Sequence, residues 1–252
     1  MQELIHFANR LADAAGEVIR SHFRTPFDIL AKEDESPVTI ADRAVEARLR
    51  EMIEAACPAD GILGEEYGVK DGTSGRTWVI DPIDGTKSFM IGRPTFGTLI
   101  ALCEEEVPVL GLIDQPVARE RWIGAKGQAT TFNGRPVTTR RCATLKDAVA
   151  GCTSPRQIAD LWPRLYGDCK AVVWGGDCYA YGMLACGWMD MVVESGLATY
   201  DYAAISPIVE GAGGWMGDWE GKPLTLSSDG RTIALGDPAL KDAALAFVRS
   251  GA

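Results

Sequence analysis

The most informative stretch of the sequence is Trp78-Val79-Ile80-Asp81-Pro82-Ile83-Asp84-Gly85-Thr86. Its apolar, β-rich residues up to Asp81 favour a short strand, and Pro82 predicts that the strand stops there. The strand therefore delivers Asp81 into a turn. Asp81 and Asp84 stand three positions apart across that turn, so their carboxylates can converge on one hard cation, which prefers oxygen ligands.

The residues after Asp81 add further groups that a phosphate site can use. The carbonyl of Ile83 can supply another oxygen ligand. Gly85 lets the backbone approach a ligand closely, and the amides of Gly85 and Thr86 can bind phosphate oxygens, especially where a helix starts there. A structural interpretation competes with this one, in which Asp81 caps a strand and Asp84-Gly85 is a surface turn.

Three further acidic segments favour a shared site. Glu65 follows the apolar pair Ile62-Leu63, which places acids at the end of another strand, although a solvated acidic turn is the alternative. Asp42 stands near the start of a helical pattern, either as an N-cap or in a proton network with a catalytic water. Asp201 also stands where an N-cap would, but its aromatic neighbours predict a partly buried carboxylate that needs a partner such as a metal.

The composition argues against several classes of protein. The chain has 252 residues, 46% hydrophobic and 24% charged, which is ordinary for a globular protein with a large core. The net charge of −10 and the lack of a Lys/Arg-rich run argue against nucleic acid and membrane surfaces as partners. The 7 cysteines form no CxxC pair, which argues against a disulfide framework or a zinc site.

The N-terminal segment lacks an uninterrupted apolar region, and no apolar stretch approaches the roughly 20 residues that cross a bilayer. We therefore expect a cytoplasmic protein that does not span a membrane. The two histidines, His6 and His22, fall within the first helical pattern and are expected to be surface or packing residues.

Hydrophobic periodicity predicts alternating helices and strands. In the first half it predicts helices over 3–23 and 41–56, a loop or short strand over 32–39, strands over 96–102, 107–113 and 120–123, and a hairpin at Asn133-Gly134. In the second half it predicts strands over 148–153, 171–174 and 189–193 and helices over 158–165, 179–186 and 202–212. The pattern indicates an α+β or layered α/β fold, in one domain over 1–252 with a soft boundary near residue 140.

Three segments in fixed order resemble the inositol monophosphatase family: Gly64-Glu65-Glu66, the stretch 81–86, and the stretch 200–214 with the pattern (W/Y)DxAAxxPIVxGAGG. The resemblance covers Lys32 to Gly214 and the helices around it. It implies an α-β-α-β-α sandwich like that of inositol monophosphatases and fructose-1,6-bisphosphatases. It also implies Mg²⁺ as cofactor, a small phosphate monoester as substrate, direct displacement by a metal-activated water, and a homodimer.

The resemblance further implies roles for individual residues. The implied metal ligands are Glu65, Asp81, Ile83 through its carbonyl, Asp84 and Asp201. The implied catalytic residues are Asp42, Glu65 and Thr86, with Asp42 and Thr86 helping to activate the attacking water. Lys32 aligns approximately with a loop lysine near the phosphate.

We expect residues in the second half of the chain to determine which substrate is bound. The stretch from Trp174 to Gly182 departs from the G-S-A-A-type stretch of inositol monophosphatases and resembles the histidinol-phosphatase branch. Asp177, with its aromatic neighbours, suits a cationic, planar ligand. Glu194 matches the position that contacts the non-phosphate end of the substrate in relatives, and Asp201 is grouped with these substrate-binding residues. We therefore expect L-histidinol phosphate, in histidine biosynthesis.

Other interpretations stay open from the sequence. Asp177 can be a helix N-cap, Glu194 an ordinary strand-end acid, and Arg156 a solvated side chain. Inositol-1-phosphate or a broad range of small phosphate monoesters is the alternative substrate class. A non-catalytic protein that binds metal or phosphate is the alternative from a different class.

Overall fold

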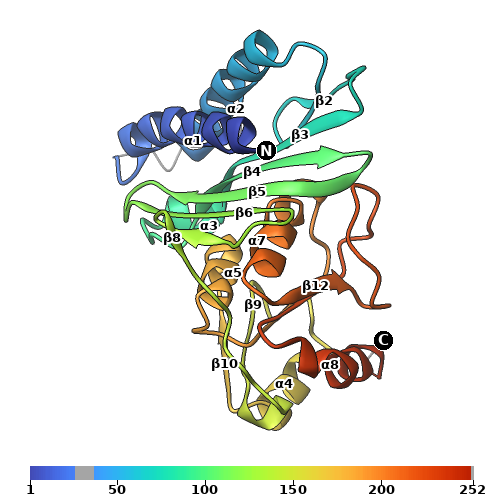
Figure 1. The fold of residues 1–252 in the computed structure, drawn as a ribbon. Coiled ribbons are helices and arrows are strands. Elements are labelled where there is room, and N and C mark those ends of the chain that lie inside the picture. Colours follow the sequence, from blue (N-terminus) through green and yellow to red (C-terminus); the bar gives the residue numbers. More distant parts are fainter. Residues whose placement is uncertain (26–36, 251–252) are drawn as a thin grey trace.

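A computed structural model describes residues 1–25 and 37–250 and shows five layers, helix, sheet, helix, sheet and helix (Figure 1). Helices α1 (Gln2–His22) and α2 (Pro37–Ala56) form the first layer. The middle helices are α5 (Asp177–Ala185), α6 (Thr199–Tyr202) and α7 (Ile205–Gly211), and the last layer holds α4 (Trp162–Asp168) and α8 (Lys241–Arg249). The predicted α-β-α-β-α order is confirmed.

The first sheet has the strand order β2-β1-β3-β4-β5-β6-β7-β8. Its strands are β1 (Gly61–Gly64), β2 (Gly68–Lys70), β3 (Arg76–Asp84), β4 (Gly97–Glu104), β5 (Val107–Gln115), β6 (Glu120–Ala125), β7 (Thr131–Phe132) and β8 (Arg135–Pro136). Asn133 and Gly134 join β7 to β8 with φ of 49° and 75°, the left-handed values of a type I′ turn, so the predicted hairpin is confirmed.

The second sheet has the order β10-β9-β11-β13-β12. Its strands are β9 (Val149–Cys152), β10 (Ala171–Trp174), β11 (Met191–Glu194), β12 (Trp215–Asp218) and β13 (Thr232–Leu235). Helices α5 and α7 contact strands of both sheets, so the middle layer joins the two halves of the chain.

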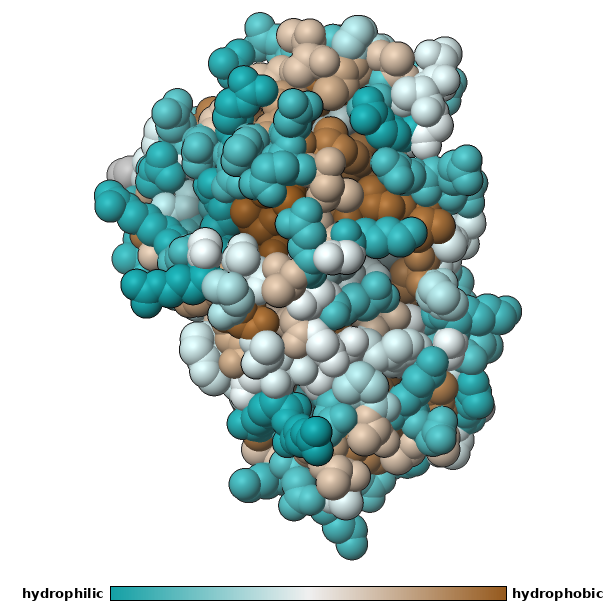
Figure 2. Space-filling view, viewed as in Figure 1, coloured by the Kyte–Doolittle hydropathy of each residue, from teal (hydrophilic) through white to brown (hydrophobic). Residues whose placement is uncertain are grey.

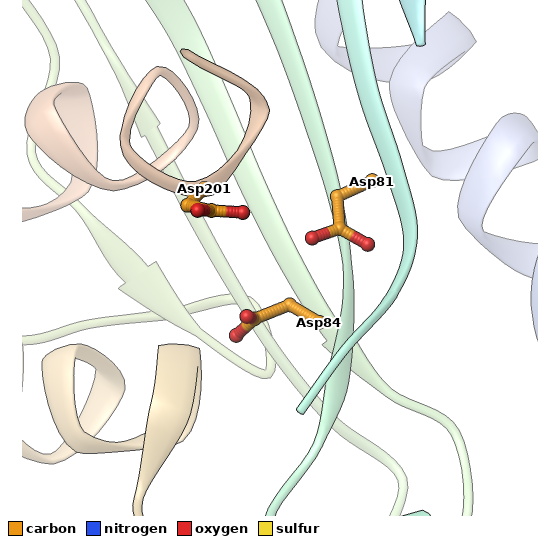
Figure 3. Close-up of side chains that lie close together, drawn as sticks. All are labelled: Asp81, Asp84 and Asp201. Carbon is orange, nitrogen blue, oxygen red and sulfur yellow. The ribbon is translucent and has the colours of Figure 1, made fainter. Parts of the chain in front are cut away.

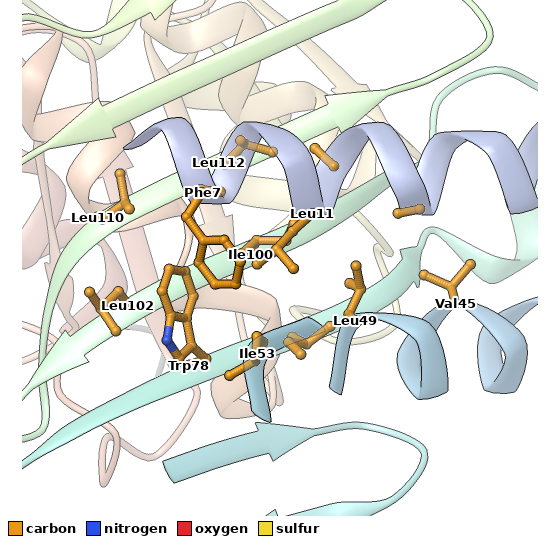
Figure 4. Close-up of a cluster of buried hydrophobic side chains, with 14 of the residues drawn as sticks. Phe7, Leu11, Val45, Leu49, Ile53, Trp78, Ile100, Leu102, Leu110 and Leu112 are labelled. Atoms are coloured by element: carbon orange, nitrogen blue, oxygen red, sulfur yellow. The ribbon is translucent and has the colours of Figure 1, made fainter. Parts of the chain in front are cut away.

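Apolar side chains fill the space between the first helices and the first sheet (Figure 4). Phe7 and Leu11 on α1 and Leu49 on α2 meet Trp78 on β3, and the rings of Phe7 and Trp78 lie edge to face with centroids 5.3 Å apart. Apolar residues recur every three or four positions in these helices because that spacing places them on one face, which is buried here.

The pleat of β3 fixes the direction of the first acidic side chain. Trp78 and Ile80 belong to the core beneath α1 and α2, whereas Val79 belongs to the core of the middle layer. Because side chains alternate across a strand, Asp81 points with Val79 toward the middle helices. The sheet thus carries Asp81 on the face where α6 lies.

Several local predictions were wrong. Strand β3 continues through Pro82 because its pairing with β4 shifts register between Asp81 and Asp84, and an irregularity of this kind tolerates a residue without an N–H. Residues 37–39 belong to α2 rather than to a loop, and 32–36 lie outside the described residues. Periodicity also missed β12, β13 and α8.

Two helices of the second half were misplaced. Helix α4 begins at Trp162 rather than at residue 158, with Pro163 in its first turn, where proline fits. The predicted helix over 202–212 is α6 followed by α7. Pro207 explains the break, since a proline cannot donate to the carbonyl four residues earlier.

The surface is mixed in polarity. Figure 2 shows hydrophilic residues over most of one face, with hydrophobic residues gathered mainly at the level of β4 and β5. Among the described residues, no helix combines the length and the apolar character needed to cross a membrane.

Candidate active site

Three aspartates from distant parts of the chain converge at the junction of the first sheet and the middle helices (Figure 3). Asp81 and Asp84 lie on β3, and Asp201 lies on α6. One carboxylate oxygen from each lies within 4.8 Å of the others. Such a spacing suits a shared cation, because three unneutralised carboxylates at this distance repel one another.

Asp81 is the most buried member of the cluster. Its side chain is 2% exposed, and its Oδ1 has no hydrogen-bond partner among the described residues. Burial, followed by repulsion from Asp84, Glu65, Asp201 and Asp42, raises its pKa well above the usual range. A buried carboxylate with a free oxygen needs either a proton or a cation.

Asp84 stands at the end of β3, past the register shift. The backbone N–H of Cys178, the second residue of α5, donates to its Oδ2 over 2.6 Å. Burial and then the neighbouring Asp177 raise the pKa of Asp84 to about 8. The first sheet and α5 are therefore tied together at the cluster.

Asp201 is not an N-cap, contrary to the sequence interpretation. It is the third residue of α6, and its Oδ2 accepts the backbone N–H of Ala198 over 2.7 Å. The carboxylate thus satisfies a free amide at the helix start from within the first turn. Burial raises its pKa to about 6, partly offset by that hydrogen bond.

Asp42 and Glu65 border the cluster. Asp42 lies inside α2 rather than at its N-cap, is 5% exposed, and has an Oδ1 without a partner among the described residues. Burial and then Glu65 raise its pKa to about 8. Glu65 follows β1 at the more exposed rim, outside the group of three, and desolvation followed by Asp201 raises its pKa to about 7.

The turn after Asp84 has the glycine that its geometry requires. Gly85 has φ of 86°, and a Cβ there would lie 3.1 Å from both Phe96 Cα and Thr95 O. Helix α3 (Thr86–Met90) begins directly after it, as the sequence suggested. The Thr86 hydroxyl donates to the Ile83 carbonyl over 3.3 Å, so this carbonyl points back toward the turn.

Asp177 and Glu194 lie beside the cluster. Asp177 is the first residue of α5 and Gly176 is the N-cap, so the N-cap alternative for Asp177 is wrong. It has φ of 45°, a strained value for a residue with a side chain. Its Oδ2 accepts from Ser88 Oγ at 3.4 Å, and burial raises its pKa.

Glu194 ends β11 with its side chain 1% exposed. The N–H of Thr153 donates to its Oε1 over 2.6 Å, while Oε2 is buried with no partner among the described residues. Burial raises the pKa of Glu194 to about 8, and Asp177 and Asp201 add to the effect. An unpartnered carboxylate oxygen in this position is a binding group for a cation.

The remaining residues singled out in the sequence are less informative. Arg156 is exposed, and Lys32 lies outside the described residues. His6 borders a groove of about 1010 Å³ between α1 and the β5–β8 edge of the sheet, which the acidic cluster does not line. His22 bonds to Val18 O within α1, as expected of a surface or packing residue.

Two contacts at the cluster gave no signal in the sequence. The Cys178 N–H donates to Asp84, and the Ser88 hydroxyl donates to Asp177. The two residues of each pair are about 90 positions apart in the chain. No local pattern links such residues, because the contact exists only after both sheets have packed on α5.

The residues present fit a hard divalent cation. They offer three converging carboxylates, and within the described part of the chain one buried oxygen each of Asp81 and Asp42 has no hydrogen-bond partner. All the donors are oxygen atoms, the type that Mg²⁺ prefers over nitrogen and sulfur. A bound cation would offset the repulsion that raises the pKa values.

Comparison with known proteins adds three kinds of match. A profile described as the inositol monophosphatase family matches residues 1–250. The chain is 47% identical over 241 residues to the bifunctional phosphatase IMPL2, chloroplastic, of Arabidopsis thaliana, covering 92% of this chain and 70% of that protein. It is 37% identical over 223 residues to a histidinol-phosphatase of Mycobacterium tuberculosis, covering 84% and 85%.

Among solved structures, an inositol monophosphatase from Zymomonas mobilis superposes with a TM-score of 0.93 at 47% identity, covering 98% of both chains. These relatives are thus named as a bifunctional phosphatase, a histidinol-phosphatase and an inositol monophosphatase.

Proposed function

Because this chain belongs to the inositol monophosphatase family, we propose that it is a Mg²⁺-dependent phosphatase that hydrolyses L-histidinol phosphate to L-histidinol and phosphate. The observation that carries the proposal is the buried Oε2 of Glu194, which has no partner within residues 1–25 and 37–250 and lies beside the three converging aspartates. A metal centre for the phosphate and an anionic pocket for an amine then lie side by side.

In this proposal Asp81, Asp84 and Asp201, with Glu65 and the Ile83 carbonyl, hold the metal. Mg²⁺, when bound, polarises phosphoryl oxygens and lowers the pKa of water. Side chains and backbone amides of the protein perform the other roles.

Asp42 presents a buried free oxygen that can orient the attacking water and accept its proton. The Thr86 hydroxyl helps to orient that water, and Glu65 assists from the rim. The amides of Gly85 and Thr86 hold the phosphate, since amides in the first turn of a helix have no acceptor within it.

The leaving-group end favours a cationic substrate. L-Histidinol carries an amine and an imidazole, and either can satisfy Glu194 Oε2 or Asp177. A cavity of about 320 Å³ lies beside the segment that precedes Asp177, and Trp174, Tyr179 and Met183 are among the residues that line it. Aromatic and thioether side chains suit the face of a planar ring.

Inositol-1-phosphate, or a broad range of small monoesters, is the competing substrate class. The 47% identity to the Zymomonas mobilis inositol monophosphatase favours it. A neutral polyol would leave the Glu194 carboxyl with a hydroxyl partner rather than a cation. A non-catalytic metal- or phosphate-binding protein is the remaining candidate, and only a measured turnover separates it.

We propose a homodimer as the assembly. Strand β10 is an edge of the second sheet and exposes Val173 and Trp174, with Trp174 58% exposed. Met90 and Ile91, at the end of α3, are also exposed apolar residues. An exposed apolar edge strand is a common pairing surface.

We further propose that one domain contains both halves, with residues 1–140 supplying most of the metal site and 141–252 most of the substrate contacts. The cytoplasmic location expected from the sequence is part of this proposal.

The test is phosphate release from L-histidinol phosphate and inositol-1-phosphate, measured in parallel with Mg²⁺ and with chelator. The proposal expects a strong preference for histidinol phosphate that chelator abolishes. A preference for inositol-1-phosphate would contradict the substrate and leave the chemistry intact. Metal-independent turnover, or none with any small monoester, would contradict the chemistry as well.

A further inference from the structure

A fully buried glutamate outside the aspartate cluster holds one of its loops. Glu46 lies on α2 and is 0% exposed. Its Oε2 accepts the backbone N–H of Glu66 over 2.7 Å, and its Oε1 accepts the N–H of Tyr67 over 3.2 Å. Arg50 Nε donates to the same Oε1 over 2.7 Å. These contacts satisfy both carboxylate oxygens.

The turn that follows β1 is shaped around this carboxylate. A Cβ on Gly64 would lie 2.0 Å from Glu46 Oε1 and 2.3 Å from its carboxyl carbon. Only glycine therefore allows the backbone to approach so closely. The glycine before Glu65 serves this contact and not a left-handed turn, since Gly64 lies within β1.

The far end of the same turn is also tied to α2. Arg50 donates to the carbonyl of Gly68, the first residue of β2, and pairs with Glu46 one helical turn earlier. The four residues from Gly64 to Tyr67 are thus fastened at both ends. Gly64 pairs with Ile80 in the parallel register of β1 and β3, so Glu65 follows β1 beside Asp81 on the neighbouring strand.

Helix α2 places two acids on one face. Asp42 and Glu46 are four residues apart, and residues with this spacing lie one above the other on a helix. Asp42 borders the aspartate cluster, and Glu46 fastens the turn that carries Glu65. One rigid element therefore sets the positions of two acidic side chains relative to β3.

We propose that Glu46 is a positioning residue for the metal centre, which fixes the turn 64–67 so that Glu65 meets the metal alongside Asp81. The inference rests on the proposed function. It assigns Glu46 no contact with metal or substrate. Its carboxylate acts through Glu65, because without it two partly buried backbone amides and Arg50 Nε lose their acceptor.

The test is calorimetric titration of the folded protein with Mg²⁺, without substrate. Glu46→Gln keeps the size of the side chain but replaces one of the two acceptor oxygens by an NH₂ group. At least one of the groups that donate to Glu46 then faces this NH₂ group and has no acceptor. We expect Mg²⁺ affinity to fall about 10- to 100-fold, as for other residues that orient metal ligands. Circular dichroism and the fitted number of sites report whether the fold is retained.

A matched control comes from the same helix. Glu51→Gln removes a surface ion pair with Arg48, at 2.6 Å, and does not touch the turn. It should leave Mg²⁺ affinity within about twofold, since exposed pairs contribute little. If Glu46→Gln does not fold, Arg50→Lys loosens the same turn and should weaken Mg²⁺ binding in the same direction.

A double-mutant cycle separates positioning from a general structural role. In a Glu65→Gln background the effect of Glu46→Gln on Mg²⁺ affinity should largely disappear, because the two residues act as a unit. Wild-type affinity in Glu46→Gln, or an equal loss in both backgrounds, would overturn the inference. Absence of Mg²⁺ binding by the wild-type protein would overturn the proposed function, and the inference with it.

Discussion

Replacement of Glu194 by glutamine tests how the substrate is chosen. The amide oxygen can keep the 2.6 Å hydrogen bond from the Thr153 N–H. The NH₂ group then takes the place of Oε2, the buried oxygen that has no partner among the described residues. A cationic substrate would meet a neutral donor instead of a carboxylate.

The size of the effect follows from the kind of bond that is lost. A hydrogen bond to a charged group contributes about 1.5–3 kcal/mol and a neutral one about 0.5–1.5 kcal/mol. Because an NH₂ group cannot accept from an amine, the whole charged bond is lost, and about 1.5–3 kcal/mol corresponds to a roughly 10- to 150-fold loss of kcat/KM. That loss should fall on L-histidinol phosphate, whereas kcat/KM for inositol-1-phosphate, whose leaving group is a neutral polyol, should change by less than about twofold.

The assay is phosphate release with both substrates at saturating Mg²⁺, with Glu3→Gln, on the exposed start of α1, as a control of equal charge change. Equal losses for both substrates, or no loss for histidinol phosphate, would refute recognition of the amine by Glu194.

Asp81→Asn should reduce Mg²⁺-dependent hydrolysis by about 10²-fold or more, because the metal supplies several kcal/mol of charge stabilisation. In chelator the same variant should melt at a higher temperature than wild type, since burial and like charges penalise this carboxylate; an unchanged or lower Tm would contradict that. The Mg²⁺ concentration at half-saturation should fall as pH rises from 6 to 8, because protons compete with metal below the raised pKa values of Asp201, about 6, and Asp84, about 8. Without metal, the stability of the folded protein should fall as pH rises. The carboxyls ionise near pH 4 in the unfolded chain but only near the raised pKa values in the folded one, so stability is lost from about pH 4 up through those raised pKa values. Thermal scans in chelator at several pH values check this. Trp174→Glu should shift the mass in light scattering from about twice 27.1 kDa toward 27.1 kDa, and a wild-type monomer would contradict the dimer.

The strongly periodic parts of the fold could be predicted from the sequence. Helices α1 and α2 begin within four residues of their predicted starts, because one face of each buries a continuous apolar stripe. The convergence of Asp81 and Asp84 also follows locally, since only Pro82 and Ile83 separate them. The predicted strands over 96–102, 107–113, 120–123, 148–153, 171–174 and 189–193 correspond to β4, β5, β6, β9, β10 and β11. The order of the five layers came from the family resemblance.

Other features depend on packing between distant segments. Whether Asp201 caps a helix or stands inside one depends on where that helix begins, and α6 begins at Thr199 with Ala198 as its N-cap. A charged residue such as Glu46 is normally placed on the solvated face of a helix, and its full burial becomes visible only when the turn 64–67 packs on α2. Strands β12 and β13 are short and pair only with each other and with β11, so periodicity alone did not reveal them.

Anomalous diffraction from crystals soaked in Mn²⁺ tests the central claim most directly, because it locates a divalent cation independently of turnover. The account predicts a peak within bonding distance of one oxygen each from Asp81, Asp84 and Asp201, and its loss in Asp81→Asn. A Mn²⁺ peak bound only elsewhere, or none at a concentration that supports hydrolysis, would contradict the assignment of this cluster as the metal centre.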